Sequence, residues 1–74
     1  MLNGCILIKV VTVKVDEVVK QVKQLKQVKK AYIAYGRFDI IAFIECRNYE
    51  EVRRVTAKIN NLAAVRSTET LVEA

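Results

Sequence analysis

Two segments of this 74-residue chain are apolar on both of their alternating faces, and this limits the folds open to it. They are residues 4–13 (GCILIKVVTV) and 38–46 (FDIIAFIEC), both rich in β-branched residues. This pattern is typical of strands covered on both sides of a sheet. Hydrophobic residues make up 53% of the chain, while a chain this short buries only about 60% of its unfolded surface. We therefore expect a single domain, residues 1–74, that buries part of its apolar surface between chains.

Residues 15–27 have the periodicity of an amphipathic helix. The apolar positions are Val15, Val18, Val19, Val22 and Leu25. From Val19 to Val28 the apolar residues recur every three positions, so each step slips by about 60° on an ideal helix. A continuous helix would turn lysines toward the core. The pattern therefore predicts a helix that ends near Lys26 or Gln27 and a strand that begins at Val28.

The residue pattern after Gln27 predicts a hairpin, a second helix and a last strand. Residues 28–36 indicate a lysine-bearing edge strand, and the turn at Gly36 leads into 38–46. Asn48 and Glu51 approximate a capping box for the helix that follows, and 65–72 is the final strand. The order βαββαβ predicts an α+β, ferredoxin-like fold with a four-stranded antiparallel sheet and both helices on one face. A second copy then covers the other face as a sheet-on-sheet dimer.

The two cysteines, Cys5 and Cys46, lie in apolar surroundings, as buried free cysteines do. If their strands are antiparallel neighbours, both residues lie at the same end of the sheet. We therefore expect the two thiols near each other and leave open whether they are oxidised.

Few residues suit catalysis or a cofactor. The chain has no histidine, one serine and only two glycines, so general acid-base chemistry, a metal site and a phosphate loop all lack their usual residues. We expect no enzyme, no cofactor and no metal. No apolar run is long enough to span a bilayer, and no signal peptide is evident, so a cytoplasmic protein is expected.

Two stretches resemble binding sites more than packing. In YGRFD (35–39), Arg37 and Asp39 offer a donor for a carboxylate and an acceptor for an ammonium, as an α-amino acid requires. The alternative is an ordinary hairpin in which the two charges satisfy each other. In RSTET (66–70), Thr68 and Thr70 present hydroxyls on one face of a strand. Threonine is also simply a good strand residue.

The chain resembles the ligand-binding RAM domain (regulation of amino acid metabolism) of the Lrp/AsnC transcription regulators. Residues 28–39 (VKKAYIAYGRFD) are similar to the run ending in G-x-[FY]-D, and residues 65–72 (VRSTETLV) to the closing strand of that family. Ala64 stands where the family often has glycine. The resemblance covers essentially the whole chain and includes no DNA-binding helix-turn-helix.

The resemblance implies a site and an assembly. Such domains form dimers and then rings, octamers or decamers, and bind a free amino acid between dimers. Carried onto this chain, the ligand-binding residues are Gly36, Asp39, Thr68, Thr70, Ile33 and Tyr35. Arg37 lies at a variable position of the motif, so its place in the site rests on its charge alone. Asp39 would orient the amino group or brace the loop. Full-length Lrp/AsnC regulators are a further candidate partner, and direct DNA binding is not expected.

Two other functions stay open. The net charge of +5 and the βαββαβ order also suit a nucleic-acid-binding module. A purely structural assembly domain that has lost ligand binding is the other alternative.

Overall fold

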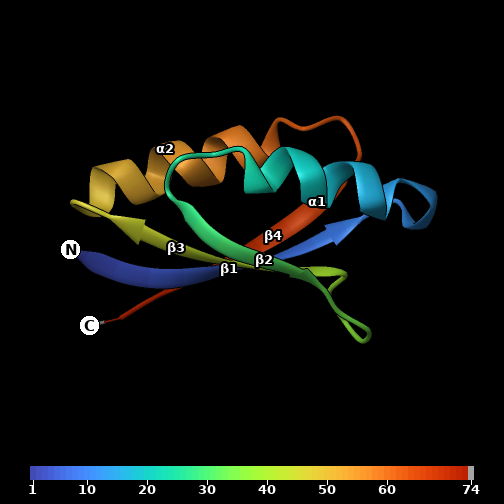
Figure 1. The fold of residues 1–74 in the computed structure, drawn as a ribbon, viewed down its shortest axis with the longest axis horizontal. Helices are drawn as coiled ribbons and strands as arrows, with labels where there is room; N and C mark the ends of the chain where they lie inside the picture. Colours follow the sequence, from blue (N-terminus) through green and yellow to red (C-terminus); the bar gives the residue numbers. More distant parts are fainter. Residues whose placement is uncertain (74) are drawn as a thin grey trace.

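The computed structural model describes residues 1–73 and has the expected α+β architecture in the order βαββαβ (Figure 1). The strands are β1 (Leu2–Val10), β2 (Val28–Ile33), β3 (Ile40–Cys46) and β4 (Val65–Val72). The helices are η1 (Thr12–Lys14, a 3-10 turn), α1 (Val15–Lys23) and α2 (Tyr49–Asn60). The sheet order is β2-β3-β1-β4, and every neighbouring pair is antiparallel. The ferredoxin-like fold is thus confirmed, with both helices on one face (Figure 1).

The first helix ends earlier than its spacing predicted. α1 stops at Lys23 rather than near Lys26 or Gln27. Two tight turns follow, in which the Leu25 N–H donates to Val22 O (3.1 Å) and the Val28 N–H to Leu25 O (3.0 Å). Bonds between residues three apart have a three-residue period. The three-residue repeat of apolar positions therefore corresponds to these turns and not to a longer helix. β2 begins at Val28, as predicted.

The strand ends differ from the predicted ranges. β1 spans 2–10 rather than 4–13, because the chain turns into η1 at Thr12. The hairpin between β2 and β3 takes six residues, 34–39, so β2 stops at Ile33 and β3 starts at Ile40. β4 matches its predicted range of 65–72.

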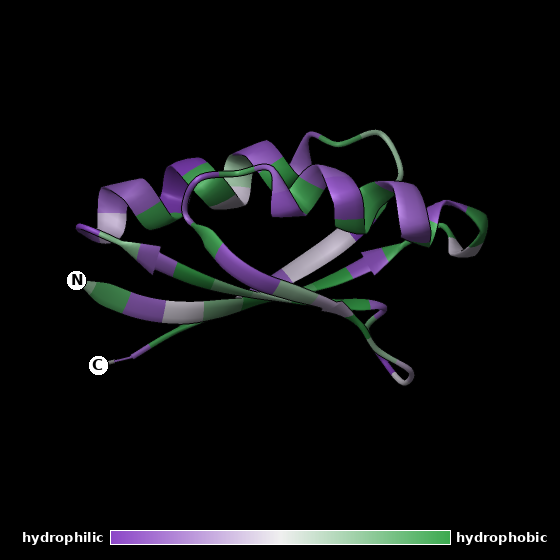
Figure 2. Cartoon of the chain, in the orientation of Figure 1, coloured by the Kyte–Doolittle hydropathy of each residue, from purple (hydrophilic) through white to green (hydrophobic). Residues whose placement is uncertain are grey.

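The core lies between the sheet and the two helices. Its largest fully buried members, all less than 2% exposed, are Ile6, Ile8, Ile40, Ile59, Val18, Val22, Val55 and Cys46. Every second residue of β1 and β3 points into this core, because side chains alternate along a strand. Figure 2 shows the outer surfaces of the helices as mostly hydrophilic. The helices therefore bury one apolar stripe each and cover only one face of the sheet.

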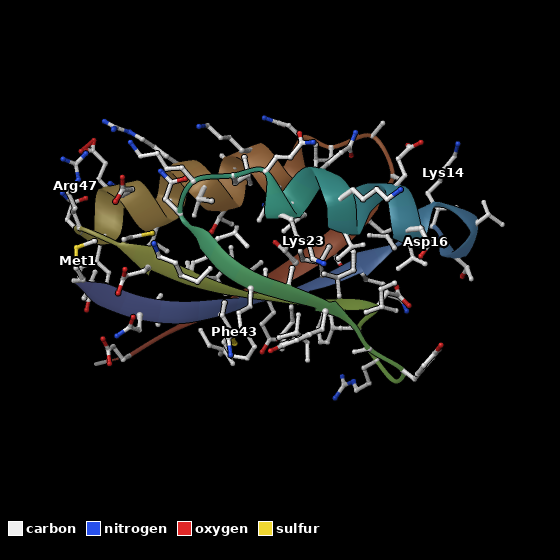
Figure 3. The ribbon with its side chains drawn as sticks, in the orientation of Figure 1. Met1, Lys14, Asp16, Lys23, Phe43 and Arg47 are labelled. Atoms are coloured by element: carbon white, nitrogen blue, oxygen red, sulfur yellow. The ribbon has the colours of Figure 1, made fainter. Side chains whose placement is uncertain are left out.

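The other side of the sheet, the open face, is covered by no helix or loop of residues 1–73 (Figures 1 and 3). Its apolar residues, placed there by the strand register, are Cys5, Leu7, Tyr32, Ile41, Phe43 and Leu71. Three of them keep a large exposed fraction: Tyr32 48%, Phe43 42% and Leu71 50%. The rings of Tyr32 and Phe43 pack edge to face with their centroids 6.0 Å apart. The central strands are thus apolar on both faces but buried on only one.

The expected proximity of the two cysteines is wrong. Cys46 pairs with Leu2 and is fully buried in the core beneath the helices, while Cys5 pairs with Phe43 on the open face. The two residues lie toward the same end of the sheet, as predicted, but point to opposite faces because their positions differ by one step in the alternation. Both are free thiols.

Candidate functional site

The hairpin between β2 and β3 requires glycine at its tip. Gly36 has φ of 142°, a backbone conformation that residues with a side chain rarely adopt. A side chain at this position would meet nothing within 4 Å, so glycine is required by the backbone conformation and not by lack of space. The Ala34 N–H donates to Asp39 O (2.8 Å) and closes the loop. The loop projects from the end of the sheet toward the side of the open face (Figure 1).

Asp39 ties this hairpin to the end of β1. Its N–H donates to Ile8 O (2.8 Å), and its carboxylate Oδ2 accepts the Val10 N–H (2.9 Å). The backbone pairing of β1 with β3 ends at Ile8 and Ile40. Beyond this point the Asp39 side chain accepts the next inward N–H of β1, that of Val10. A half-buried carboxylate that binds a backbone N–H is well held in position. Asp39 therefore braces the loop, one of the two roles that the resemblance implied.

Arg37 and Asp39 do not satisfy each other, contrary to the ordinary-hairpin alternative. Arg37 is exposed, and its guanidinium has no carboxylate within 4.0 Å among residues 1–73. Its carbonyl accepts a long hydrogen bond from Lys9 Nζ (3.4 Å). Within the described residues, the loop thus carries a cation without an ionic partner and, two positions along the chain, a carboxylate fixed by a backbone N–H.

The two apolar residues expected to line the site lie at its margin. Tyr35 is 99% exposed and Ile33 is 40% exposed. Ile33 pairs with Ile40 and points to the helix side of the sheet, at its edge. In the single chain neither residue closes a pocket around the hairpin, although both remain available to a second molecule.

Thr68 and Thr70 point to the helix side of β4, so the expectation of two hydroxyls on one face is confirmed. Each hydroxyl already has a partner on α2. Thr68 Oγ1 donates to Asn60 Oδ1 (2.9 Å), and Thr70 Oγ1 lies 3.2 Å from Thr56 Oγ1. These contacts join α2 to the edge strand. A ligand that used the same hydroxyls would have to displace or share them.

The hairpin and the threonines are separated within one chain. Ile8 of β1 pairs with Ile40 on one side and with Thr68 on the other. β3 and β4 are therefore two strand spacings apart, about 10 Å. The structure does not bring the two predicted groups into one pocket of a single chain.

Comparison with protein-family models decides the assignment. Residues 4–73 match the model described as the Lrp/AsnC ligand binding domain. The chain belongs to this family. None of the curated proteins compared with it matches.

Solved structures share the fold of this Lrp/AsnC domain. TTHA0845 from Thermus thermophilus is 28% identical with a TM-score of 0.96, covering 100% of this chain and 94% of that one. FFRP-DM1 is 27% identical with a TM-score of 0.93, covering 100% of both chains. A feast or famine regulatory protein from M. tuberculosis (Rv3291c), complexed with L-methionine, is 15% identical with a TM-score of 0.83, covering 99% of this chain and 50% of that one. At 15% identity the last likeness concerns the fold alone.

Sequence reasoning missed the partners of the predicted residues in this Lrp/AsnC domain. The Val10 N–H, bound by Asp39, is a backbone group that no side-chain pattern identifies. Thr56 and Asn60 bind the two threonines, and their spacing of four residues places them on one side of α2. Their four-residue spacing, next to the apolar stripe of the helix, was the sequence signal that could have identified them as partners of the threonines.

The opposite end of the sheet contains a second polar cluster that holds the two layers together. The Glu51 carboxylate accepts the Arg47 N–H (2.7 Å) and Gln27 Nε2 (3.3 Å), and the Glu51 N–H is capped by Asn48 Oδ1 (2.9 Å). The backbone hydrogen bond from Arg47, followed by that from Gln27, lowers the pKa of Glu51 below its ordinary value. Nearby, burial raises the pKa of the Cys46 thiol, with a further contribution from Glu51. A buried thiol with a raised pKa is a poor nucleophile.

No group of three or more metal-ligating side chains occurs within residues 1–73. Over the same residues, neither helix is long and apolar enough to cross a bilayer.

Proposed function

We propose that this Lrp/AsnC domain binds a free amino acid at contacts between subunits and that the hairpin 34–39 supplies the polar groups. Arg37 would take the ligand carboxylate, while Asp39 and the free backbone of Gly36 would face its ammonium group. The observation that carries the proposal is that one loop holds both the Arg37 guanidinium, which has no carboxylate partner among residues 1–73, and the Asp39 carboxylate, which accepts the Val10 N–H. The methionine bound to the M. tuberculosis relative supports this class of ligand.

The rest of the proposed site comes from a neighbouring subunit. Ile33 and Tyr35 are exposed beside the hairpin and would line the ligand side chain. Thr68 and Thr70 would contribute hydroxyls across the subunit contact, exchanging their bonds to α2. Because the hairpin and these threonines lie apart in one chain, a site that uses both needs two chains.

The proposed assembly begins with the open face. Two copies pack sheet on sheet as a dimer, which removes Tyr32, Phe43 and Leu71 from water. Dimers then join into a ring, an octamer or a decamer. An amino acid that binds between dimers favours the assembled state by its differential affinity for the two states.

The domain would act in transcription regulation of amino acid metabolism rather than as an enzyme. We propose that it works in the cytoplasm. Full-length Lrp/AsnC regulators share the domain that forms such contacts, so mixed assemblies with them are a proposed route to gene control.

Isothermal titration against the twenty amino acids tests ligand binding, and light scattering on the same samples tests assembly. We expect heat from at least one amino acid and a mass that depends on it. A folded oligomer that gives no heat with any amino acid would contradict ligand binding and favour the purely structural alternative.

Single-stranded nucleic acid is a second candidate ligand because of one observation on the open face. Tyr32 and Phe43 place two aromatic rings side by side on the sheet, with Lys30 on the same face. Bases stack on such rings in RNA-binding sheets. Salt-dependent gel retardation with RNA and duplex DNA separates the two functions. If the open face is buried in a dimer, the protein should retard neither nucleic acid.

A further inference from the structure

The turn from β1 into η1 and α1 forms a corner of the molecule that exposes apolar side chains. Val11 is 42% exposed and Val13 is 85% exposed. The Lys14 N–H donates to Val11 O (2.8 Å), and the Val11 N–H donates to Ala64 O (2.9 Å) in the loop before β4. Because two backbone hydrogen bonds fix the corner, Val13 is held as an apolar side chain that projects from it.

Val11 and Lys14, on either side of Val13 in the chain, line a pocket of about 350 Å³. Its full lining is Val11, Lys14, Glu17, Gln21, Ala63 and Ala64. The apolar part comes from Val11 and the two alanines, whose small side chains leave the space open. The corner therefore carries an apolar projection and, next to it, an apolar hollow.

The charges at the rim of this pocket are complementary to themselves. Lys14, at the outer end of the helix layer (Figure 3), and Glu17 have no oppositely charged group within 4.0 Å in the part of the chain that the structure describes. A second copy related by a two-fold axis brings its own Glu17 to Lys14 and its own Lys14 to Glu17. The same rotation brings its Val13 to the pocket. A rim with one cation and one anion has no net charge to attract a strongly acidic or basic partner, but it fits a second copy.

The corner lies at the same end of the sheet as the hairpin 34–39 (Figure 1), because the Val10 N–H at the end of β1 donates to the Asp39 carboxylate. If an amino acid binds at this hairpin between dimers, the contact between dimers must lie at this end of the sheet. Two different two-fold contacts per chain, the open face and the corner, generate a closed ring with an even number of chains.

We propose that the corner of Val13 and its neighbouring pocket is the surface through which one open-face dimer binds the next. Its partner is a second copy of this chain. The inference rests on the ring assembly proposed above and adds the surface that forms the second contact.

Light scattering at equal protein concentrations tests the contact with Val13→Asp. We expect the wild type to have the mass of several dimers and Val13→Asp the mass of two chains. Its circular dichroism should be unchanged, because Val13 is outside the core. Combining Val13→Asp with Phe43→Glu should leave single chains. The matched control is Tyr49→Asp, a 60% exposed position at the start of α2, which should keep the wild-type mass.

Charge reversal tests the two-fold pairing at the rim. Lys14→Glu should lower the mass because two acidic groups then meet across the axis. Combining it with Glu17→Lys should restore the mass, since the reversed rim is again complementary to itself. No recovery in this double variant would overturn the pairing.

The outcomes separate the corner from the rest of the proposed function. A folded Val13→Asp variant that keeps the wild-type ring mass would overturn the corner contact and leave the ring in place. A wild type with the mass of two chains would overturn both. Titration calorimetry on the same wild-type sample decides amino-acid binding independently of either result.

Discussion

Both faces of the sheet carry apolar residues on the central strands β1 and β3, but only one face is covered by helices. On the helix side, Ile6, Ile8 and Ile40 are fully buried beneath α1 and α2. On the open side, Phe43 lies on the same strand as Ile40 but keeps 42% of its surface exposed. The chain thus has a complete core on one face and an apolar surface without cover on the other.

This difference suggests separate roles for the two faces: the helix side stabilises the fold, and the open side makes contacts with other molecules. Burial beneath the helices supplies the stability of a single chain. The apolar open face adds little to that chain but offers a contact to a second one. The hairpin with Arg37 and Asp39 projects on the same side as the open face (Figure 1). Substitutions on the two faces should therefore affect different measurements.

The largest expected loss of stability follows from Ile8→Ala on the helix side. Ile8 is 0% exposed, so the substitution should reduce the free energy of unfolding by about 2–5 kcal/mol. Urea unfolding at fixed protein concentration measures it. The matched control is Leu7→Ala, next to it on the open face, which should cost the single chain less and lower the mass of the assembly. Equal losses of unfolding free energy from Ile8→Ala and Leu7→Ala would contradict the claim that only the helix side stabilises the single chain.

The next effect concerns Asp39, where two variants separate bracing from charge. Asp39→Ala leaves the Val10 N–H without its partner and should cost about 1–3 kcal/mol. Asp39→Asn keeps an oxygen for this N–H and should be nearly as stable as the wild type. Both variants lose the negative charge, so titration calorimetry should record weaker amino-acid binding for both. Normal binding by the stable Asn variant would contradict a ligand role for the carboxylate.

A smaller effect is expected from Thr70→Val on the helix side. The substitution removes a hydrogen bond with Thr56 and should cost about 0.5–1.5 kcal/mol in the free energy of unfolding. The double variant Thr56→Val with Thr70→Val removes both partners and should recover part of that loss. Calorimetry on the Thr70 variant then tests ligand contact independently. Unchanged affinity would restrict the amino-acid site to the hairpin and its apolar neighbours.

The smallest effect is the pH dependence that Glu51 contributes to the joint between the layers. Because its pKa in the folded chain lies below the ordinary 4.5, ionised Glu51 stabilises the fold above that pH. This contribution is lost as the pH falls through the folded pKa. Glu51→Gln should therefore flatten the fall in stability on acidification, measured by urea midpoints at neutral and acidic pH. Glu50→Gln, an exposed position, is the control, and equal curves for Glu51→Gln and wild type would contradict the assignment.

The sequence predicted the fold because its patterns are local and repeated. Alternation in 4–13 and 38–46 identified the central strands, and the break in the period at 19–28 located the start of β2 at Val28. The end of α1 was wrong because three-residue spacing suits tight turns as well as a distorted helix. The cysteine pair was wrong because the prediction compared ends of strands and not their faces.

The candidate site was less predictable than the fold. The positions of Gly36, Arg37 and Asp39 followed from the turn, but the bond from Val10 to Asp39 depends on where the β1–β3 pairing ends. The threonine hydroxyls were placed on the correct common face, while their partners on α2 depend on how the helix packs over β4. Contacts between distant segments follow from packing, which a single pattern does not specify.

Light scattering on the wild type and on Phe43→Glu tests the central claim most directly, namely that the open face is the subunit contact. The account predicts a wild-type mass that is a multiple of the 8.4 kDa chain. Phe43→Glu should retain its helical circular dichroism and fall to a lower mass, while Lys20→Glu on the outer surface of α1 should keep the wild-type mass. A wild-type monomer, or a folded Phe43→Glu variant of unchanged mass, would contradict it.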